Sequence, residues 1–225
     1  MRRVVVTGKR SSFVWPYDRA EVIADGVIHA LGVGLALAGA VALFIIARDA
    51  TDGREFVAIA VYALALLTAL ALSAAYNLWP VSPVKWLLRR LDHSAIYVLI
   101  AGTYTPFLTQ LKSGFAATGL FVGVWATAAV GIAVKLLLPG RFDRVAVGLY
   151  LALGWSGAFA YDAVAAVLPA AALWLLAVGG GLYSLGVVFH AWRSLRFQNA
   201  IWHAFVLLGA TCHYGAVLAG IIGAP

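Results

Sequence analysis

The stretch FVAIAVYALALLTALALSAAYNLWP, residues 56–80, decides the fold class of this chain. It lies within an uncharged run of 29 residues, from 56 to 84. A bilayer is crossed by about 20 consecutive apolar residues in an α-helix, so the run is long enough for one span. Near its end stand two polar residues, Ser73 and Asn77, whose four-residue spacing places them on one helix face. We therefore predict a membrane-spanning helix that carries a polar pair at one end.

Six other uncharged runs share this character, at 26–47, 94–111, 113–134, 145–161, 163–192 and 197–225. With 64% hydrophobic and 11% charged residues, the chain lies far outside the composition of soluble domains. We therefore predict an all-α membrane protein with seven transmembrane helices in one bundle. The helical domain is expected over residues 21–225, after a cytoplasmic arm over residues 1–20. Pro106 is expected to kink the third span or end it early.

The positive charges predict the orientation in the membrane. The net charge is +7, but thirteen Lys and Arg residues fall before the first span and in alternate loops, against three in the others. The positive-inside rule then places the N-terminus in the cytoplasm and the C-terminus outside. This pattern favours a topology signal over nucleic-acid binding, so we expect no nucleic-acid partner. Cys212, the only cysteine, excludes an intrachain disulfide and a cysteine metal cluster.

Polar residues recur at the expected cytoplasmic ends of the second, third and last spans: Ser73 and Asn77, Asp92 and His93, and Asn199 and His203. Such residues are costly inside a membrane and usually mark a functional site. We therefore expect Ser73, Asn77, Asp92, Asn199 and His203 to line one cavity. A buried carboxylate needs a partner, and His203 is the one we expect for Asp92.

A fourth polar stripe opens the first span, where Glu21, Asp25 and His29 follow one another at intervals of four. Acidic residues are favourable at the positive end of a helix dipole, so the stripe fits a solvated helix start. It fits equally well a fourth wall of the same pocket, with Asp25 and His29 turned inward. The sequence leaves both interpretations open.

Four stretches carry a resemblance to a known family: EVIADGVIHALG (21–32), LSAAYNLWP (72–80), RRLDHSAIYVLIAGTYTPF (89–107) and NAIWHAFVLLGATCHYGAV (199–217). They resemble the bacterial hemolysin III family, which belongs with the progestin and adipoQ receptors and, more distantly, the alkaline ceramidases. The resemblance covers all seven expected spans in order. It implies an integral, multi-pass protein of the bacterial inner membrane.

The resemblance also implies a zinc site near the cytoplasmic face. The family pattern has Ser-x-x-x-His ending the second span, Asp opening the third and His-x-x-x-His opening the seventh. Three imidazoles and a water make a catalytic zinc shell, which Ser and Asp would orient. Carried over residue by residue, Ser73, Asp92 and His203 match the pattern and are the candidate catalytic residues of a lipid amide hydrolase.

Two of the three family ligands are missing from this chain, because Asn77 and Asn199 stand where the pattern has histidine. An amide oxygen is a poor zinc ligand, so we expect no stoichiometric zinc and no other cofactor. Asn still keeps a hydrogen-bonding group at each position, which suits a metal-free polar pocket. The alternative is a rebuilt site, in which Asp25, His29 or His93 joins His203 and Asp92.

Three functions are compatible with these residues and with the family resemblance. The first is a metal-free, lipid-binding or receptor-like membrane protein whose polar cytoplasmic pocket takes a small hydrophobic or lipid ligand. The second is a metal-dependent hydrolase of lipid amides with a rebuilt zinc site. The third is the pore-forming or cytolytic activity that gives the family its name, although the outer halves of the spans are nearly all apolar. The sequence leaves the oligomeric state open.

Overall fold

A computed structural model describes residues 17–111 and 115–223, and its regular structure is helical throughout. Within these ranges no strand occurs, which confirms the predicted all-α class. The helices are α1 (Arg19–Ala50), α2 (Gly53–Leu78), α3 (Pro83–Gln110), α4 (Phe115–Leu137), α5 (Asp143–Trp155), the 3₁₀ helix η1 (Ser156–Ala160), α6 (Tyr161–Ala165), α7 (Ala170–Ala191) and α8 (Gln198–Ile222). Of the expected arm over residues 1–20, only the last four residues fall within the described ranges.

Five helices are long and apolar enough to cross a membrane: α1, α2, α4 from Ala117, α7 and α8. The expected fifth span, 145–161, is not one continuous helix. α5 has 13 residues and ends at Trp155, and the chain continues as the 3₁₀ helix η1 and the short α6. A helix of that length covers only about 20 Å at 1.5 Å per residue, less than the roughly 30 Å core of a bilayer.

The third span also differs from the prediction. α3 begins at Pro83, well before the uncharged run that opens at residue 94, because charged residues in its first turns do not prevent a helix. Pro106 lies inside α3, which continues to Gln110, so the expected early end at this proline is wrong. A proline has no N–H to donate to the carbonyl four residues earlier, so it removes one hydrogen bond from the helix without preventing the turn that follows.

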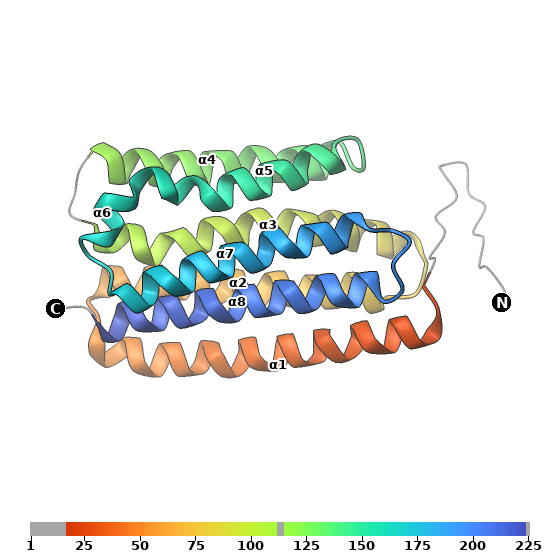
Figure 1. Ribbon diagram of the computed structural model, residues 1–225, viewed down its shortest axis with the longest axis horizontal. Coiled ribbons are helices and arrows are strands. Elements are labelled where there is room, and N and C mark those ends of the chain that lie inside the picture. Colours follow the sequence, from red (N-terminus) through yellow and green to blue (C-terminus); the bar gives the residue numbers. More distant parts are fainter. Residues whose placement is uncertain (1–16, 112–114, 224–225) are drawn as a thin grey trace.

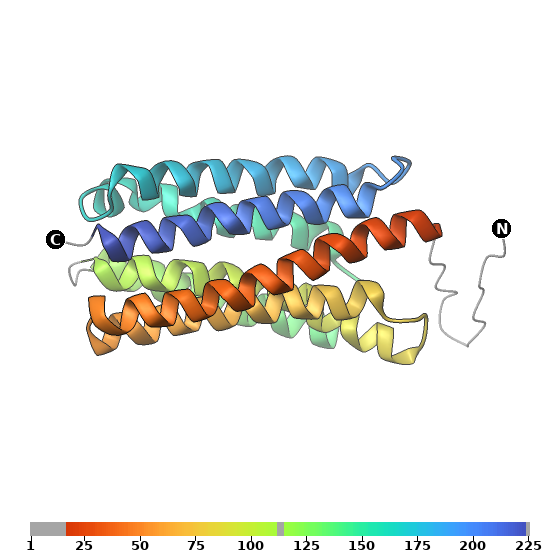
Figure 2. The same ribbon diagram turned by 90° about the horizontal axis from the view of Figure 1, so that it is seen from below.

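The helices run alternately up and down, and neighbours in sequence pack side by side (Figure 1). α2 packs against α3, and α7 packs against α8. α1 packs against both α2 and α8, so the first and last helices are neighbours (Figure 2). The starts of α1, α3 and α8 and the ends of α2 and α7 therefore meet at one end of the bundle, which we call the polar end.

Contacts at the start of α1 fix the position of α8. Asp18 and Glu21 form a capping box, in which Asp18 Oδ1 accepts from Glu21 N at 3.0 Å and Glu21 Oε2 accepts from Asp18 N at 2.8 Å. The hydrogen bond from Glu21 N lowers the pKa of the Asp18 carboxyl. Phe197, at φ 59° in the turn before α8, donates its N–H to Glu21 Oε1 at 3.0 Å. Glu21 thus serves as a helix cap, and it ties the start of α8 to that of α1.

Candidate functional site

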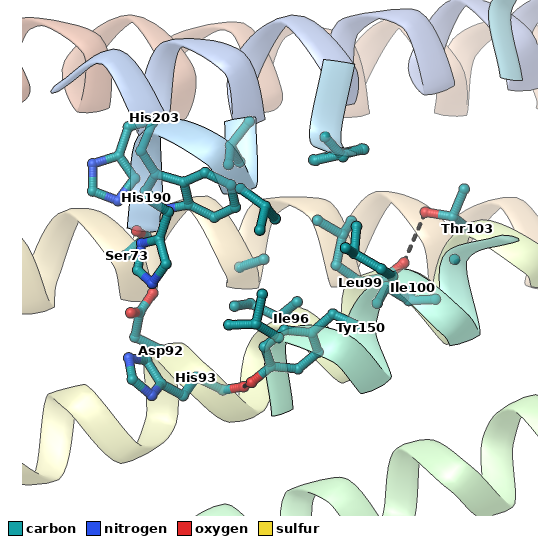
Figure 3. Close-up of a pocket in the computed structure, with 18 of the residues that line it drawn as sticks. Ser73, Asp92, His93, Ile96, Leu99, Ile100, Thr103, Tyr150, His190 and His203 are labelled. Carbon is teal, nitrogen blue, oxygen red and sulfur yellow. Dashed lines mark hydrogen bonds between the residues drawn. The ribbon is translucent and has the colours of Figure 1, made fainter. Parts of the chain in front are cut away.

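A cavity of about 1410 Å³ runs through the bundle from the polar end. α2, α3, α5, α7 and α8 supply most of its wall. Figure 3 shows Ser73, Asp92, His93, His190 and His203 gathered on one side, and aliphatic side chains of α3 along the rest. On α7 the lining extends from Leu173 to His190, which is roughly 25 Å at 1.5 Å per residue. The cavity is therefore long and apolar, with one polar end.

The residues predicted to share this cavity all line it: Ser73, Asn77, Asp92, Asn199 and His203. His29 and His93 line it as well. The placement follows from helix direction, because α2 ends where α3 and α8 begin. Their chemical roles still have to be derived from the contacts that each one makes.

Asp25 forms the centre of the polar network. It is only 4% exposed, and its Oδ1 accepts from Nδ1 of His203 at 2.6 Å. Its Oδ2 accepts from Nδ2 of Asn199 at 2.8 Å and lies 3.5 Å from Nε2 of His29. Of the stripe on the first span, His29 lines the cavity, whereas Asp25 is not in the lining itself and contacts it through His203 and Asn199. Glu21 belongs to the helix cap.

His203 pairs with Asp25, so the expected pairing of His203 with Asp92 is wrong. The physical reason is the packing of α1 against α8, which brings Asp25 to the α8 face that carries Asn199 and His203. The rings of His29 and His203 also meet there, with centroids 4.4 Å apart. Neither sequence spacing nor helix direction specifies which helix lies next to α8.

The two asparagines at the family ligand positions link α2 to α8. Asn199 Nδ2 donates to Asn77 Oδ1 at 3.1 Å as well as to Asp25. Asn77 Nδ2 donates to the Ser73 carbonyl at 2.9 Å, and Lys85 Nζ, itself buried, donates to the Asn77 carbonyl at 3.1 Å. The bond between the two amides therefore bridges α2 and α8 at the polar end of the bundle.

A second group of charges lies where α3, α4 and α5 meet. Asp143 accepts from Lys135 Nζ at 2.7 Å and pairs with Arg89. Although burial raises the pKa of Asp143, these two cations outweigh it and lower the pKa to about 2. His93 faces this group, with its Nδ1 3.9 Å from Asp143 Oδ1, and its carbonyl accepts from Tyr150 at 2.8 Å. His93 is therefore associated with Asp143, and it is not part of the group formed by Asp25, His29 and His203.

Some cavity residues were missed by sequence reasoning. Lys135 and Asp143 are not among the residues predicted for the pocket, yet both line the cavity. His190 also lines it, and its buried Nδ1 has no hydrogen-bond partner. Position at the polar end of a helix could have flagged all three, because the same criterion selected Asn77 and Asp92.

One group of side chains has the composition and spacing of a metal site. Potential ligand atoms of Asp25, His29 and His203 all lie within 4.8 Å of one another. Two imidazoles and one carboxylate are a ligand set of catalytic zinc sites. His29 Nε2 is buried and has no hydrogen-bond partner, which is the state of a side chain available to a ligand. These residues therefore fit a zinc-type ion, although Asp92, expected in a rebuilt site, is not among them.

Comparison with known proteins places the sequence of this chain in a family. The sequence model of haemolysin-III related proteins matches residues 20–214. The hemolysin-3 homolog of Bacillus subtilis (strain 168) is 36% identical over 205 residues, which is 91% of this chain and 96% of the relative. Hemolysin-3 of Bacillus cereus is 35% identical over 198 residues, 88% of this chain and 90% of that protein.

A human relative extends the comparison beyond bacteria. The monocyte to macrophage differentiation factor of Homo sapiens is 30% identical over 203 residues, covering 88% of this chain and 83% of the relative. No solved structure matches the chain with significant similarity. Five apolar helices and these relatives together make the chain an integral, multi-pass membrane protein. The resemblance noted in the sequence is thus confirmed, and this chain belongs to the haemolysin-III related family.

Proposed function

We propose that the protein binds one amphipathic lipid in its cavity, with the apolar chain along α3 and α7 and the head at the polar end. The observation that carries this proposal is the shape and polarity of the cavity. Its volume of about 1410 Å³ exceeds the roughly 300–1,000 Å³ of drug-sized pockets. Its length along α7, roughly 25 Å, approaches the thickness of a hydrocarbon core. A chain-like ligand uses such a space better than a compact one.

Native mass spectrometry of the protein in mild detergent tests this proposal through its bound lipid. Ala177 lines the cavity on α7, whereas Ala171 is exposed on the same helix and outside the lining. Ala177→Trp should lower the fraction of lipid-bound protein about fivefold or more by filling the space, and Ala171→Trp should leave it unchanged. Equal lipid retention in both variants would place the lipid outside the cavity and refute the proposal.

The Asp25, His29 and His203 group favours a second function, metal-dependent hydrolysis of a lipid amide. A bound zinc would lower the pKa of a water and polarise a carbonyl. The chain's own residues would do the rest: Asn199 holds Asp25 in position, while Ser73 and Asp92 lie on the same cavity wall. A lipid that entered with its head at the polar end would bring an amide bond toward these groups. The hydrolase named in the family resemblance would then use ligands from α1 in place of those lost from α2 and α8.

Cobalt absorption and product analysis test this second function separately. Protein that has been stripped of metal with a chelator should bind one Co²⁺ per chain. His29→Ala and His203→Ala should each abolish the absorption band of the bound Co²⁺. His213→Ala is the matched control, because His213 lies on α8 outside the group. Release of fatty acid from an N-acyl lipid should follow metal binding. Metal binding without hydrolysis would leave a lipid-binding protein with a structural ion, and no metal binding would refute the second function.

We also propose seven membrane crossings with the N-terminus in the cytoplasm and the C-terminus outside. The support is the thirteen to three distribution of basic residues and the alternating direction of the helices. In this arrangement, α3 and the α5–η1–α6 segment add two crossings to the five apolar helices. A reporter fused after Pro225 that proved cytoplasmic would overturn the orientation.

The mostly apolar cavity wall beyond the polar end disfavours the pore-forming alternative.

A further inference from the structure

The polar end of the cavity carries a surplus of positive charge. Among the described residues that line it are five cationic side chains, Arg89, Arg90, Lys135, Arg141 and Arg193. Two carboxylates line it as well, those of Asp92 and Asp143. A cavity wall with this balance attracts anions, and the low-dielectric surroundings strengthen that attraction.

The ion pairs leave the surplus in place. Lys135 and Arg89 share Asp143. Within the described part of the chain, no carboxylate lies within 4.0 Å of the guanidinium groups of Arg90, Arg141 or Arg193. The Nε of Arg90 is moreover buried without a hydrogen-bond partner. A buried guanidinium donor normally has an acceptor, so this one is available to a ligand.

Membrane topology alone does not explain the pattern. The positive-inside rule accounts for basic residues at this end of the bundle, but not for their position around a cavity. Of the four described arginines outside the lining, Arg48 and Arg196 each have a carboxylate within reach, whereas Arg19 and Arg54 do not. In the lining, Arg90, Arg141 and Arg193 lack one among the described residues, and the buried Nε of Arg90 lacks any hydrogen-bond partner, which points to a negative charge supplied by the ligand.

We propose that the lipid bound in this cavity is anionic, with a phosphate or carboxylate head held by Arg90, Arg141 and Arg193. This inference rests on the proposed lipid binding and names the class of ligand. Guanidinium groups present paired N–H donors that match the oxygens of phosphate and carboxylate. The head would lie where the cations line the cavity, and the chain would follow the aliphatic wall of α3. Anionic lipids are abundant in the cytoplasmic leaflet, which the proposed topology places at this end.

Displacement of a fluorescent fatty acid, cis-parinaric acid, from protein in phosphatidylcholine nanodiscs tests the proposal. Oleate and oleyl alcohol form a matched pair with the same chain, as do oleoyl lysophosphatidic acid and monoolein. The anionic member of each pair should displace the probe at a concentration about tenfold or more lower than its neutral partner. Arg90→Gln and the exposed Arg193→Gln should each reduce that preference severalfold, and Arg48→Gln, at the other end of α1, should not change it.

The outcomes separate this inference from the proposed function. Equal displacement by anionic and neutral lipids would overturn the anionic head while leaving lipid binding intact. Failure of every lipid to displace the probe would overturn the proposed function itself. Displacement by inorganic phosphate as effectively as by lysophosphatidic acid would show that the cations bind a free anion, and the lipid head would be refuted. Because Arg193 is exposed, its variant is expected to fold even if the Arg90 variant does not.

Discussion

Asp25 and Asp143 each join several helices at the polar end, but their surroundings differ. The side chain of Asp25 is 6% exposed, and its partners are two imidazoles and one amide. That of Asp143 is 34% exposed, and it is held by two full cations, Arg89 and Lys135. The two carboxylates therefore differ in whether their neighbours could also ligate a metal ion. Imidazoles next to a buried carboxylate can coordinate a metal ion, whereas ammonium and guanidinium groups have no free lone pair and repel a cation.

The largest expected effect is on stability when either carboxylate is removed. Asp25→Ala leaves the buried His203 without its acceptor and Asn199 with only Asn77 Oδ1, which should lower the free energy of unfolding by about 3–5 kcal/mol. Asp143→Ala should cost about 1 kcal/mol or less, because the carboxylate is 34% exposed and water that already reaches it can take its place. Unfolding in mixed micelles of SDS and a mild detergent measures both. Similar losses in the two variants would contradict the contrast drawn between the two carboxylates.

Substitution of the two asparagines tests whether the group around Asp25 can bind a metal ion. Asn77 and Asn199 are already linked to Asp25 through hydrogen bonds, so imidazoles there would lie beside the existing group. The double variant Asn77→His/Asn199→His should bind zinc about tenfold or more tightly than the parent, measured by competition with a chromophoric chelator.

Its matched control is Asn77→Ala/Asn199→Ala, which removes the same amide bridges without adding ligands. A folded histidine variant whose zinc affinity matches that of the control would show that these positions do not converge on one site.

Lys85 tests how strongly the polar network depends on its support from α3. Its ammonium group donates to the carbonyls of Asn77 and Trp79 at the end of α2, at 3.1 Å and 2.7 Å. Lys85→Met removes both donors and should lower the free energy of unfolding by about 1–3 kcal/mol. Arg48→Met, at an exposed position, should stay within about 0.5 kcal/mol of the parent. Equal stability of the two variants would exclude a structural role for Lys85.

The smallest expected effect is the pH dependence of the Asp143 group. The pKa of Asp143 is lowered in the folded state to about 2, so its contribution to stability is present above the unfolded value, about 3.9, and is lost as pH falls toward 2. The stability difference between the parent and Asp143→Asn, about 1 kcal/mol or less, should be constant from about pH 5 to 8 and shrink below about pH 4. A difference that instead grew on acidification would reverse the assigned sign. Asp49→Asn, at a fully solvated ion pair, is the control.

Much of the fold was predictable because charge and hydropathy are local properties. The uncharged runs located the long helices, and the third helix starts early only because charged residues fit its first turns. The break after Trp155 was not predictable, because an uncharged run reads the same whether it forms one helix or a helix followed by a 3₁₀ turn. At Pro106 the sequence left a kink and an early end open, and the early end is wrong because propensity at one residue does not determine where a packed helix ends.

For the site, the pattern of polar residues along the chain was enough to predict which end of the bundle is polar. Ser73, Asn77, Asp92, Asn199 and His203 line one cavity because alternating helix directions bring the end of one helix beside the start of the next. No pattern in the sequence indicates that His203 pairs with Asp25, 178 residues away. That pairing depends on which helices are neighbours and how each is rotated about its axis, and both are set by side-chain packing between distant segments. The same packing brings Asp25, His29 and His203 into one group. It also brings Arg90, Arg141 and Arg193, which come from separate segments, to one cavity.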